Sequence, residues 1–89
     1  GVFASSDIIA AQVVKECRRL GRRVPDDVRV VGFDGIGLGQ FFTPGLSTIQ
    51  QPIREIAKTS VQLLIDQING KDVQRENVLP VKLVEKETT

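Results

Sequence analysis

The sequence predicts an α/β fold with a mainly parallel sheet and helices on both faces. Short apolar segments alternate with two amphipathic segments of roughly 15 residues each, a pattern typical of strand–helix–strand units. The apolar segment Val28–Phe33 has almost no polar interruption, as expected of a strand covered on both faces. Glycine and proline residues separate the segments, so the predicted order is strand, helix, strand, loop, strand, helix, strand.

The first helix is predicted by a capping sequence and an apolar stripe. A short apolar strand at Val2–Ala4 leads into two serines, of which Ser6 can cap the helix, and Asp7 then complements the helix dipole. Gly21 and Pro25 end the helix. Its apolar face consists of residues that recur at helical spacing: Ile9, Ala10, Val13, Val14, Cys17 and Leu20.

The second half of the chain repeats the alternation after a loop. Residues 35–45 contain four glycines and a proline, which interrupt helices and strands too often for regular secondary structure. Leu46–Gln50 is predicted to be a short strand, and Pro52 suits the first position of a helix that ends at Asn69-Gly70. Val78–Val84 is predicted to be a strand, and a proline near its start places it at a sheet edge.

The composition excludes most catalytic sites. The 89 residues allow one modest domain at most, and a net charge of +1 creates no broad field toward nucleic acid or an anionic membrane. With no histidine and a single cysteine, the chain can form neither a Ser-His-Asp triad nor an ordinary zinc site. We therefore expect no enzymatic activity, no metal and no cofactor. Because the sequence lacks methionine and opens within an apolar segment, we interpret it as a fragment of a longer protein.

Two polar segments are predicted to meet at one rim of the sheet. Ser6 follows the first strand and Asp34 follows the second, and the carboxyl ends of neighbouring parallel strands share an edge where ligands bind. A carboxylate there can accept two hydrogen bonds from adjacent hydroxyls of a sugar. The structural alternatives stay open: Asp34 as a brace of its loop, Ser6 as a helix cap without a ligand, and Asp7 as a first-turn residue that complements the dipole.

Two further clusters have both a structural and a functional interpretation. Arg18, Arg19, Arg22 and Arg23 form a basic cluster at the end of the first helix, which we interpret as a solvated helix end rather than a phosphate site. Three large apolar residues in the loop indicate either the edge of the core or a partner surface: Leu38, Phe41 and Phe42.

Five sequence blocks, in order, resemble the lactose/galactose repressor family of bacterial transcriptional regulators. They are F-A-S-S-D before a helix, G-R-R-V-P-D-D-V-R-V-V-G-F-D, T-P-G-L-S-T-I-Q-Q-P, an amphipathic helix ending in N-G, and L-P-V-K-L-V-E-K-E-T-T. The resemblance covers nearly the whole chain. It implies that residues 1–89 are a C-terminal fragment of the effector-binding core, a two-lobed structure like that of periplasmic binding proteins, without the DNA-binding headpiece.

The resemblance also implies roles for individual residues. Asp34 matches the family's sugar-contacting aspartate and Ser6 a polar contact, while Gln51 and Ile53 fall at the crossover between the lobes, beside the effector cleft. A further set matches positions that line the dimer interface: Ala10, Ala11, Leu38, Phe41 and Phe42. The chain departs from the family at Gly35, where a second Asp or Asn is common, and at Gly45, where proline is usual.

The function implied by the resemblance is that of a cytoplasmic, homodimeric repressor without a membrane partner. A small effector, expected to be a sugar, would bind the cleft and change the affinity of the missing headpiece for operator DNA. The alternative is a fragment of a secreted sugar-binding transport protein of the same fold. Since the helix after Pro52 packs in the other lobe in this family, we also expect the isolated chain to self-associate.

Overall fold

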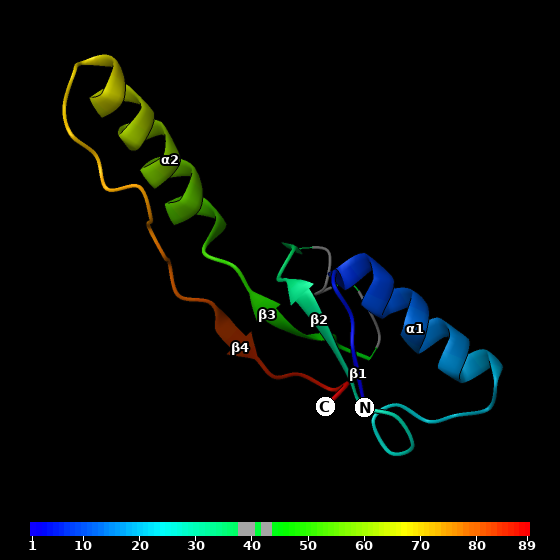
Figure 1. Cartoon of the computed structure of the whole chain (residues 1–89). Helices are drawn as coiled ribbons and strands as arrows, with labels where there is room; N and C mark the ends of the chain where they lie inside the picture. The colour runs from blue at the N-terminus through cyan, green and yellow to red at the C-terminus, as the bar shows by residue number, and fades with distance from the viewer. Residues whose placement is uncertain (38–40, 42–43) are drawn as a thin grey trace. The chain divides into compact units, whose positions relative to one another are not determined.

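The computed structural model describes residues 1–37, 41 and 44–89 (Figure 1). These residues form two compact units, one of Gly1–Gln51 with Lys82–Thr89 and the other of Pro52–Val81. The first unit contains β1 (Val2–Phe3), α1 (Asp7–Arg19), β2 (Val30–Asp34), β3 (Ser47–Gln50) and β4 (Lys82–Val84), and the second contains α2 (Ile53–Ile68). This is the predicted order of elements.

The sheet of the first unit is mainly parallel, as predicted. Its strand order is β1-β2-β3-β4, with β1, β2 and β3 parallel and β4 antiparallel to β3. The expected edge position of the last strand is confirmed, although β4 begins only at Lys82, beyond Pro80, which has no amide hydrogen for a ladder. The second strand also begins later than expected and extends through Asp34, so that Asp34 is its last residue.

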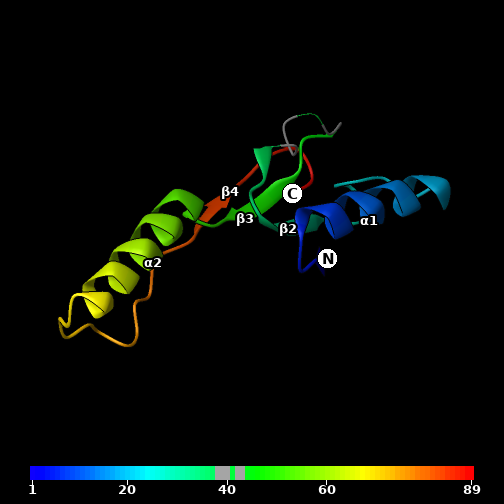
Figure 2. The same cartoon turned by 90° about the horizontal axis from the view of Figure 1, so that it is seen from above.

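Helix α1 packs against the sheet along β2 (Figures 1 and 2). Ser6 caps its first turn, and Gly21, which we expected to end the helix, follows with a φ of 72°, the left-handed conformation typical of a glycine at a helix end. The small core between helix and sheet is aliphatic, in a chain whose only aromatic residues are four phenylalanines. Its buried members are Ala4, Ala10, Val14, Val30 and Leu46.

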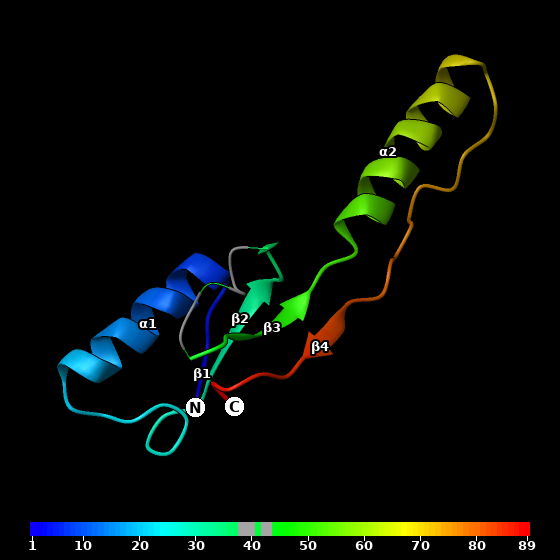
Figure 3. The ribbon, with the colours of Figure 1, turned by 180° about the vertical axis from the view of Figure 1, so that it is seen from behind.

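The C-terminal residues complete the sheet where β2 and β3 begin. The amide of Val30 donates to the Thr88 carbonyl oxygen at 2.9 Å, while the Thr88 hydroxyl donates to the Val30 carbonyl at 2.7 Å and accepts from the Ser47 amide at 2.8 Å. All three residues are fully buried. Thr88 thus joins the ends of two strands, and the two chain termini lie at the same end of the sheet (Figures 1 and 3).

Two arginines at and beyond the end of α1 pair with acidic neighbours. Arg19 pairs with Glu16 at 2.8 Å, and the Arg23 amide donates to the Asp27 carboxylate at 2.7 Å. The backbone hydrogen bond from Arg23, and then the bond from its side chain, lower the pKa of Asp27 below its ordinary value. This local pairing agrees with our interpretation of the basic cluster as a solvated helix end.

The second unit is a helix and a returning segment. Pro52 lies at the N-cap of α2, with a φ of −78° and a ψ of 68°, rather than at the first helical position that we expected; the hydrogen bond from the Ile56 amide to the Pro52 carbonyl closes the first turn. After Asn69 the chain runs back alongside the helix (Figure 3), and residues of both segments line one groove, among them Leu63 and Leu79. Among the described residues, neither helix is long and apolar enough to cross a bilayer.

Helix α2 exposes most of its apolar face. None of its residues is buried, and six large apolar side chains are between 38% and 74% exposed: Ile53, Ile56, Val61, Leu64, Ile65 and Ile68. An exposed apolar stripe of this extent is typical of a surface that another protein element covers.

We therefore expect the isolated 89-residue chain to self-associate. Analytical ultracentrifugation across a concentration series should show a mass that rises above that of one chain of 9.8 kDa. The double variant Leu64→Glu/Ile68→Glu should shift this equilibrium toward the monomer, because it places two charges in the stripe, whereas Gln67→Glu, a matched change at a polar position, should not. A concentration-independent monomer for the unmodified chain would contradict this expectation.

Candidate functional site

The structure brings the two predicted polar segments together at one rim. β1 and β2 are adjacent and parallel, so the loops that follow them emerge at the same edge. Ser6 and Asp7 follow β1, Asp34 ends β2, and the amide of Ile36 donates to the Asp7 carboxylate at 2.9 Å. This hydrogen bond joins the first residue of α1 to the loop after β2, and the predicted rim geometry is confirmed.

Asp34 has an unusual backbone and a carboxylate that is only partly engaged. Its φ is 118°, in the region that normally favours glycine, and non-glycine residues held there are concentrated at functional sites. The side-chain amide of Gln51 donates to Asp34 Oδ1 at 2.6 Å, and the Gln51 backbone amide donates to the Asp34 carbonyl at 3.1 Å. Within the described part of the chain, no hydrogen bond reaches Asp34 Oδ2, so this oxygen can accept one from a ligand.

Ser6 has the structural role that the sequence offered as one of two interpretations. Its hydroxyl oxygen accepts a hydrogen bond from the Ile9 amide at 3.2 Å, which makes it the N-cap of α1. The bond uses the oxygen as an acceptor and leaves the hydroxyl hydrogen to donate elsewhere. A cap and a ligand contact are therefore compatible in one residue.

Gln51 and Ile53 lie in different units. Gln51 is half-buried and contacts Asp34 within the first unit, so the structure brings these two predicted residues together. Ile53 is the first residue of α2 in the second unit, and its side chain is 54% exposed.

The sequence did not predict the role of Asp7. We expected a first-turn residue that complements the helix dipole, but Asp7 is also buried, with only 1% of its surface exposed. Its Oδ1 accepts a hydrogen bond from the Thr48 hydroxyl at 2.5 Å, and its Oδ2 accepts from the Ile36 amide. An acidic residue directly after the N-cap was the available signal. The partners lie on β3 and on the loop after β2, which spacing within one helix does not reveal.

The residues predicted for the dimer interface differ in exposure. Ala10 is fully buried and belongs to the core between α1 and the sheet, so the prediction for this residue is corrected: it has no surface for a partner chain. Ala11 is half-buried and Phe41 is 74% exposed. Leu38 and Phe42 lie outside the described residues.

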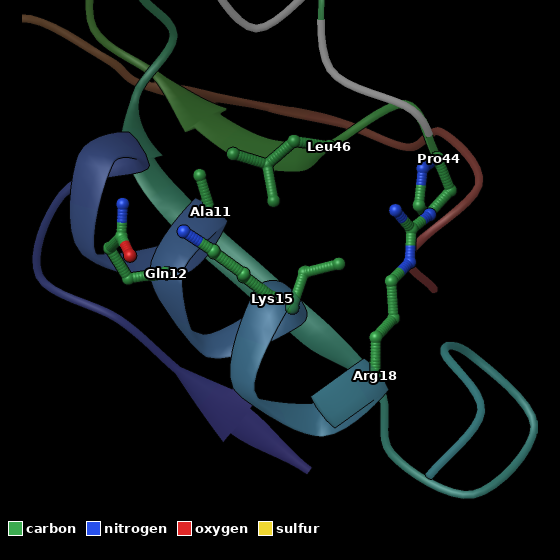
Figure 4. A pocket seen from close by; sticks show the side chains of 7 residues that line it. Ala11, Gln12, Lys15, Arg18, Pro44 and Leu46 are labelled. Carbon is green, nitrogen blue, oxygen red and sulfur yellow. The ribbon is translucent and has the colours of Figure 1, made fainter. Parts of the chain in front are cut away.

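A groove of about 310 Å³ runs along α1 beside the segment that enters β3 (Figure 4). Ala11, Lys15 and Arg18 line it from the helix, and Pro44 and Leu46 line it from the facing segment. None of its lining residues belongs to the rim around Asp34. The groove therefore belongs to the surface of α1 that carries Ala11 and not to the predicted effector site.

Comparison with known proteins gives matches over the full chain. Residues 1–89 match the model of the periplasmic binding protein-like domain. The ribose operon repressor of Halalkalibacterium halodurans is 48% identical over 100% of this chain, which spans 27% of that protein's length.

Solved structures show the same arrangement of elements. A periplasmic binding protein/LacI transcriptional regulator from Alkaliphilus metalliredigens, complexed with D-xylulofuranose, matches with a TM-score of 0.91 and 42% identity, over 100% of this chain and 34% of that chain. The lac repressor dimer bound to operator and an anti-inducer matches with a TM-score of 0.92 and 33% identity, over 98% of this chain and 30% of that one.

Proposed function

This chain belongs to the family of periplasmic binding protein-like domains, and on that premise we propose that it is the effector-binding part of a sugar-responsive transcriptional repressor. The similar proteins include an operon repressor and a regulator complexed with a sugar, which favours this function over that of a secreted transport protein. The whole protein would act in the cytoplasm through binding equilibria and would catalyse no reaction.

The observation that carries the proposal is the half-engaged carboxylate of Asp34 at the rim. Gln51 fixes Oδ1, and among the described residues no hydrogen bond reaches Oδ2, so the carboxylate is oriented before a ligand arrives. Adjacent hydroxyls of a sugar donate hydrogen bonds to such an acceptor, and the Ser6 hydroxyl adds a further polar contact from the neighbouring loop.

Dimerisation and DNA binding follow from the same proposal. The similar lac repressor is a dimer bound to operator. We assign the dimer contact of this protein to the surface of α1 with Ala11 and to the segment between β2 and β3 that contains Leu38, Phe41 and Phe42. The effector and the operator would favour different conformations of the dimer, so that each changes the affinity for the other.

The test is the variant Asp34→Asn in the full-length protein that contains this chain. Asparagine keeps the shape of the side chain and tolerates a positive φ, but it removes the charge that strengthens hydrogen bonds from sugar hydroxyls. Titration calorimetry with ribose and with D-xylulose should show affinity for one of these sugars in the unmodified protein. The variant should bind that sugar about 10- to 100-fold more weakly.

Asp26→Asn is the matched control, because it makes the same chemical change on an exposed turn outside the rim. It should leave sugar affinity unchanged. Gel-shift titration should then show that the bound sugar alters operator affinity in the unmodified protein. Equal sugar affinities for Asp34→Asn and the unmodified protein would contradict the assignment of Asp34.

A further inference from the structure

We propose that Asp7 is a positioning residue of the effector site, whose buried carboxylate fixes the turn that carries Asp34. The inference rests on the proposed function for its effect on sugar binding. Its structural part, that Asp7 holds the turn in place, is independent of any ligand.

Both carboxylate oxygens of Asp7 are used within the first unit. Oδ1 accepts from the Thr48 hydroxyl on β3, and Oδ2 accepts from the amide of Ile36, 29 residues along the chain. Among the residues that the structure describes, no lysine or arginine forms an ion pair with Asp7. The buried carboxylate is therefore balanced by these two donors and by the positive end of α1, of which it is the first residue.

The sheet is shaped to admit this carboxylate. A Cβ atom at Gly32 would lie 2.5 Å from Asp7 Oδ1 and 3.3 Å from the Asp7 Cα, so glycine at this position lets the start of α1 approach β2 closely. Since the Gly32 register partner on β3 is Thr48, the glycine and the donor hydroxyl lie side by side beneath Asp7. The buried side chain of Asp7 therefore connects the start of the helix with the strands and the loop around it.

The turn after β2 is held at both of its ends. Asp34 and Gly35 both have positive φ, 118° and 72°, which turns the chain sharply where the ladder with β3 ends. Gln51 holds Asp34 from one side, and Asp7 holds Ile36 at the far end of the turn. Without the Asp7 contact, Gly35 would be free to change its conformation, and the Asp34 carboxylate would no longer be held in one orientation.

Hydrogen exchange measures the turn directly in the full-length protein. In Asp7→Ala, the exchange rate of the Ile36 amide should rise by at least about tenfold over that in the unmodified protein, because the acceptor of its hydrogen bond is lost. Val14→Ala is the control, since it removes buried volume from the same helix away from the rim. At comparable loss of global stability, the control should leave Ile36 protected relative to neighbouring core amides.

Sugar binding then tests the functional consequence. Asp7→Ala should bind the sugar identified above about tenfold or more weakly, while Val14→Ala should bind it normally. Asp7→Asn should restore most of the affinity, because the amide oxygen can accept from Ile36 while its NH2 group donates to Thr48. If Asp7→Ala does not fold, Thr48→Val replaces it, with faster Ile36 exchange and weaker binding again expected.

Unchanged exchange at Ile36 in the Asp7 variant, or equal losses of sugar affinity in the Asp7 and Val14 variants, would overturn the inference. If the unmodified protein binds neither sugar, the proposed function fails. The exchange rates at Ile36 still decide the structural part in that case, since faster exchange confined to the Asp7 variant supports it and unchanged exchange refutes it.

Discussion

Replacing Gly32 with alanine is expected to destabilise the first unit by about 2–4 kcal/mol. The new methyl group would lie 2.5 Å from Asp7 Oδ1 and 3.2 Å from the Ala10 Cβ. A flexible side-chain end normally moves aside at little cost, but Oδ1 is held by the Thr48 hydroxyl. Relief of the clash therefore breaks a buried hydrogen bond or lifts α1 from the sheet, and either change removes a large share of the stability of a small fold.

Urea denaturation followed by circular dichroism measures this effect. Gly37→Ala is the matched control, because a Cβ atom there meets nothing within 4 Å and the residue lies in the exposed loop. The control should unfold at nearly the midpoint of the unmodified protein, while Gly32→Ala should unfold at clearly lower urea. Coincident midpoints for the two glycine variants would show that the close approach of Asp7 is not needed.

Local features of the chain were predictable because their causes are local. The Ser6 cap and the left-handed Gly21 bracket α1 as expected, since capping and chain reversal depend on residues within one turn. The parallel arrangement of β1 and β2 follows from a strand–helix–strand unit, and it places Asp34 at the rim beside Ser6. The spacing of the apolar residues and the positions of the residues that end helices and strands were therefore enough to predict the fold and the rim geometry.

Features that depend on distant partners were not predictable in this way. The Thr48 hydroxyl meets Asp7 across 41 residues, and the Thr88 hydroxyl meets the Val30 carbonyl across 58. Asp7, Thr48 and Thr88 are polar residues of types that are mostly exposed in proteins, and only the arrangement of the strands decides that they are buried here. Ala10 was assigned to the dimer interface from the family resemblance, whereas its spacing placed it on the apolar face of the first helix, and the structure buries it in the core.

Replacing Thr88 with valine is expected to destabilise the sheet by about 2–5 kcal/mol, since it keeps the side-chain shape and removes only the hydroxyl. The Ser47 amide would lose its acceptor and the Val30 carbonyl would lose a donor, at residues that are fully buried. The backbone bonds of Thr88 to Val30 and Gly45 would remain, so the C-terminal segment keeps its path.

Thr88→Ser separates the hydrogen bonds from packing. Serine keeps the hydroxyl and loses one buried methyl group, at a cost of about 1 kcal/mol. Denaturation midpoints should therefore rank the unmodified protein first, Thr88→Ser slightly lower and Thr88→Val lowest. If serine proves as destabilising as valine, the methyl group rather than the hydroxyl fixes this residue. The starts of β2 and β3 would then depend on packing against Thr88. The hydrogen bonds of the Thr88 hydroxyl with Ser47, 41 residues away, and with Val30, 58 residues away, would not explain why the C-terminal segment joins β2 to β3.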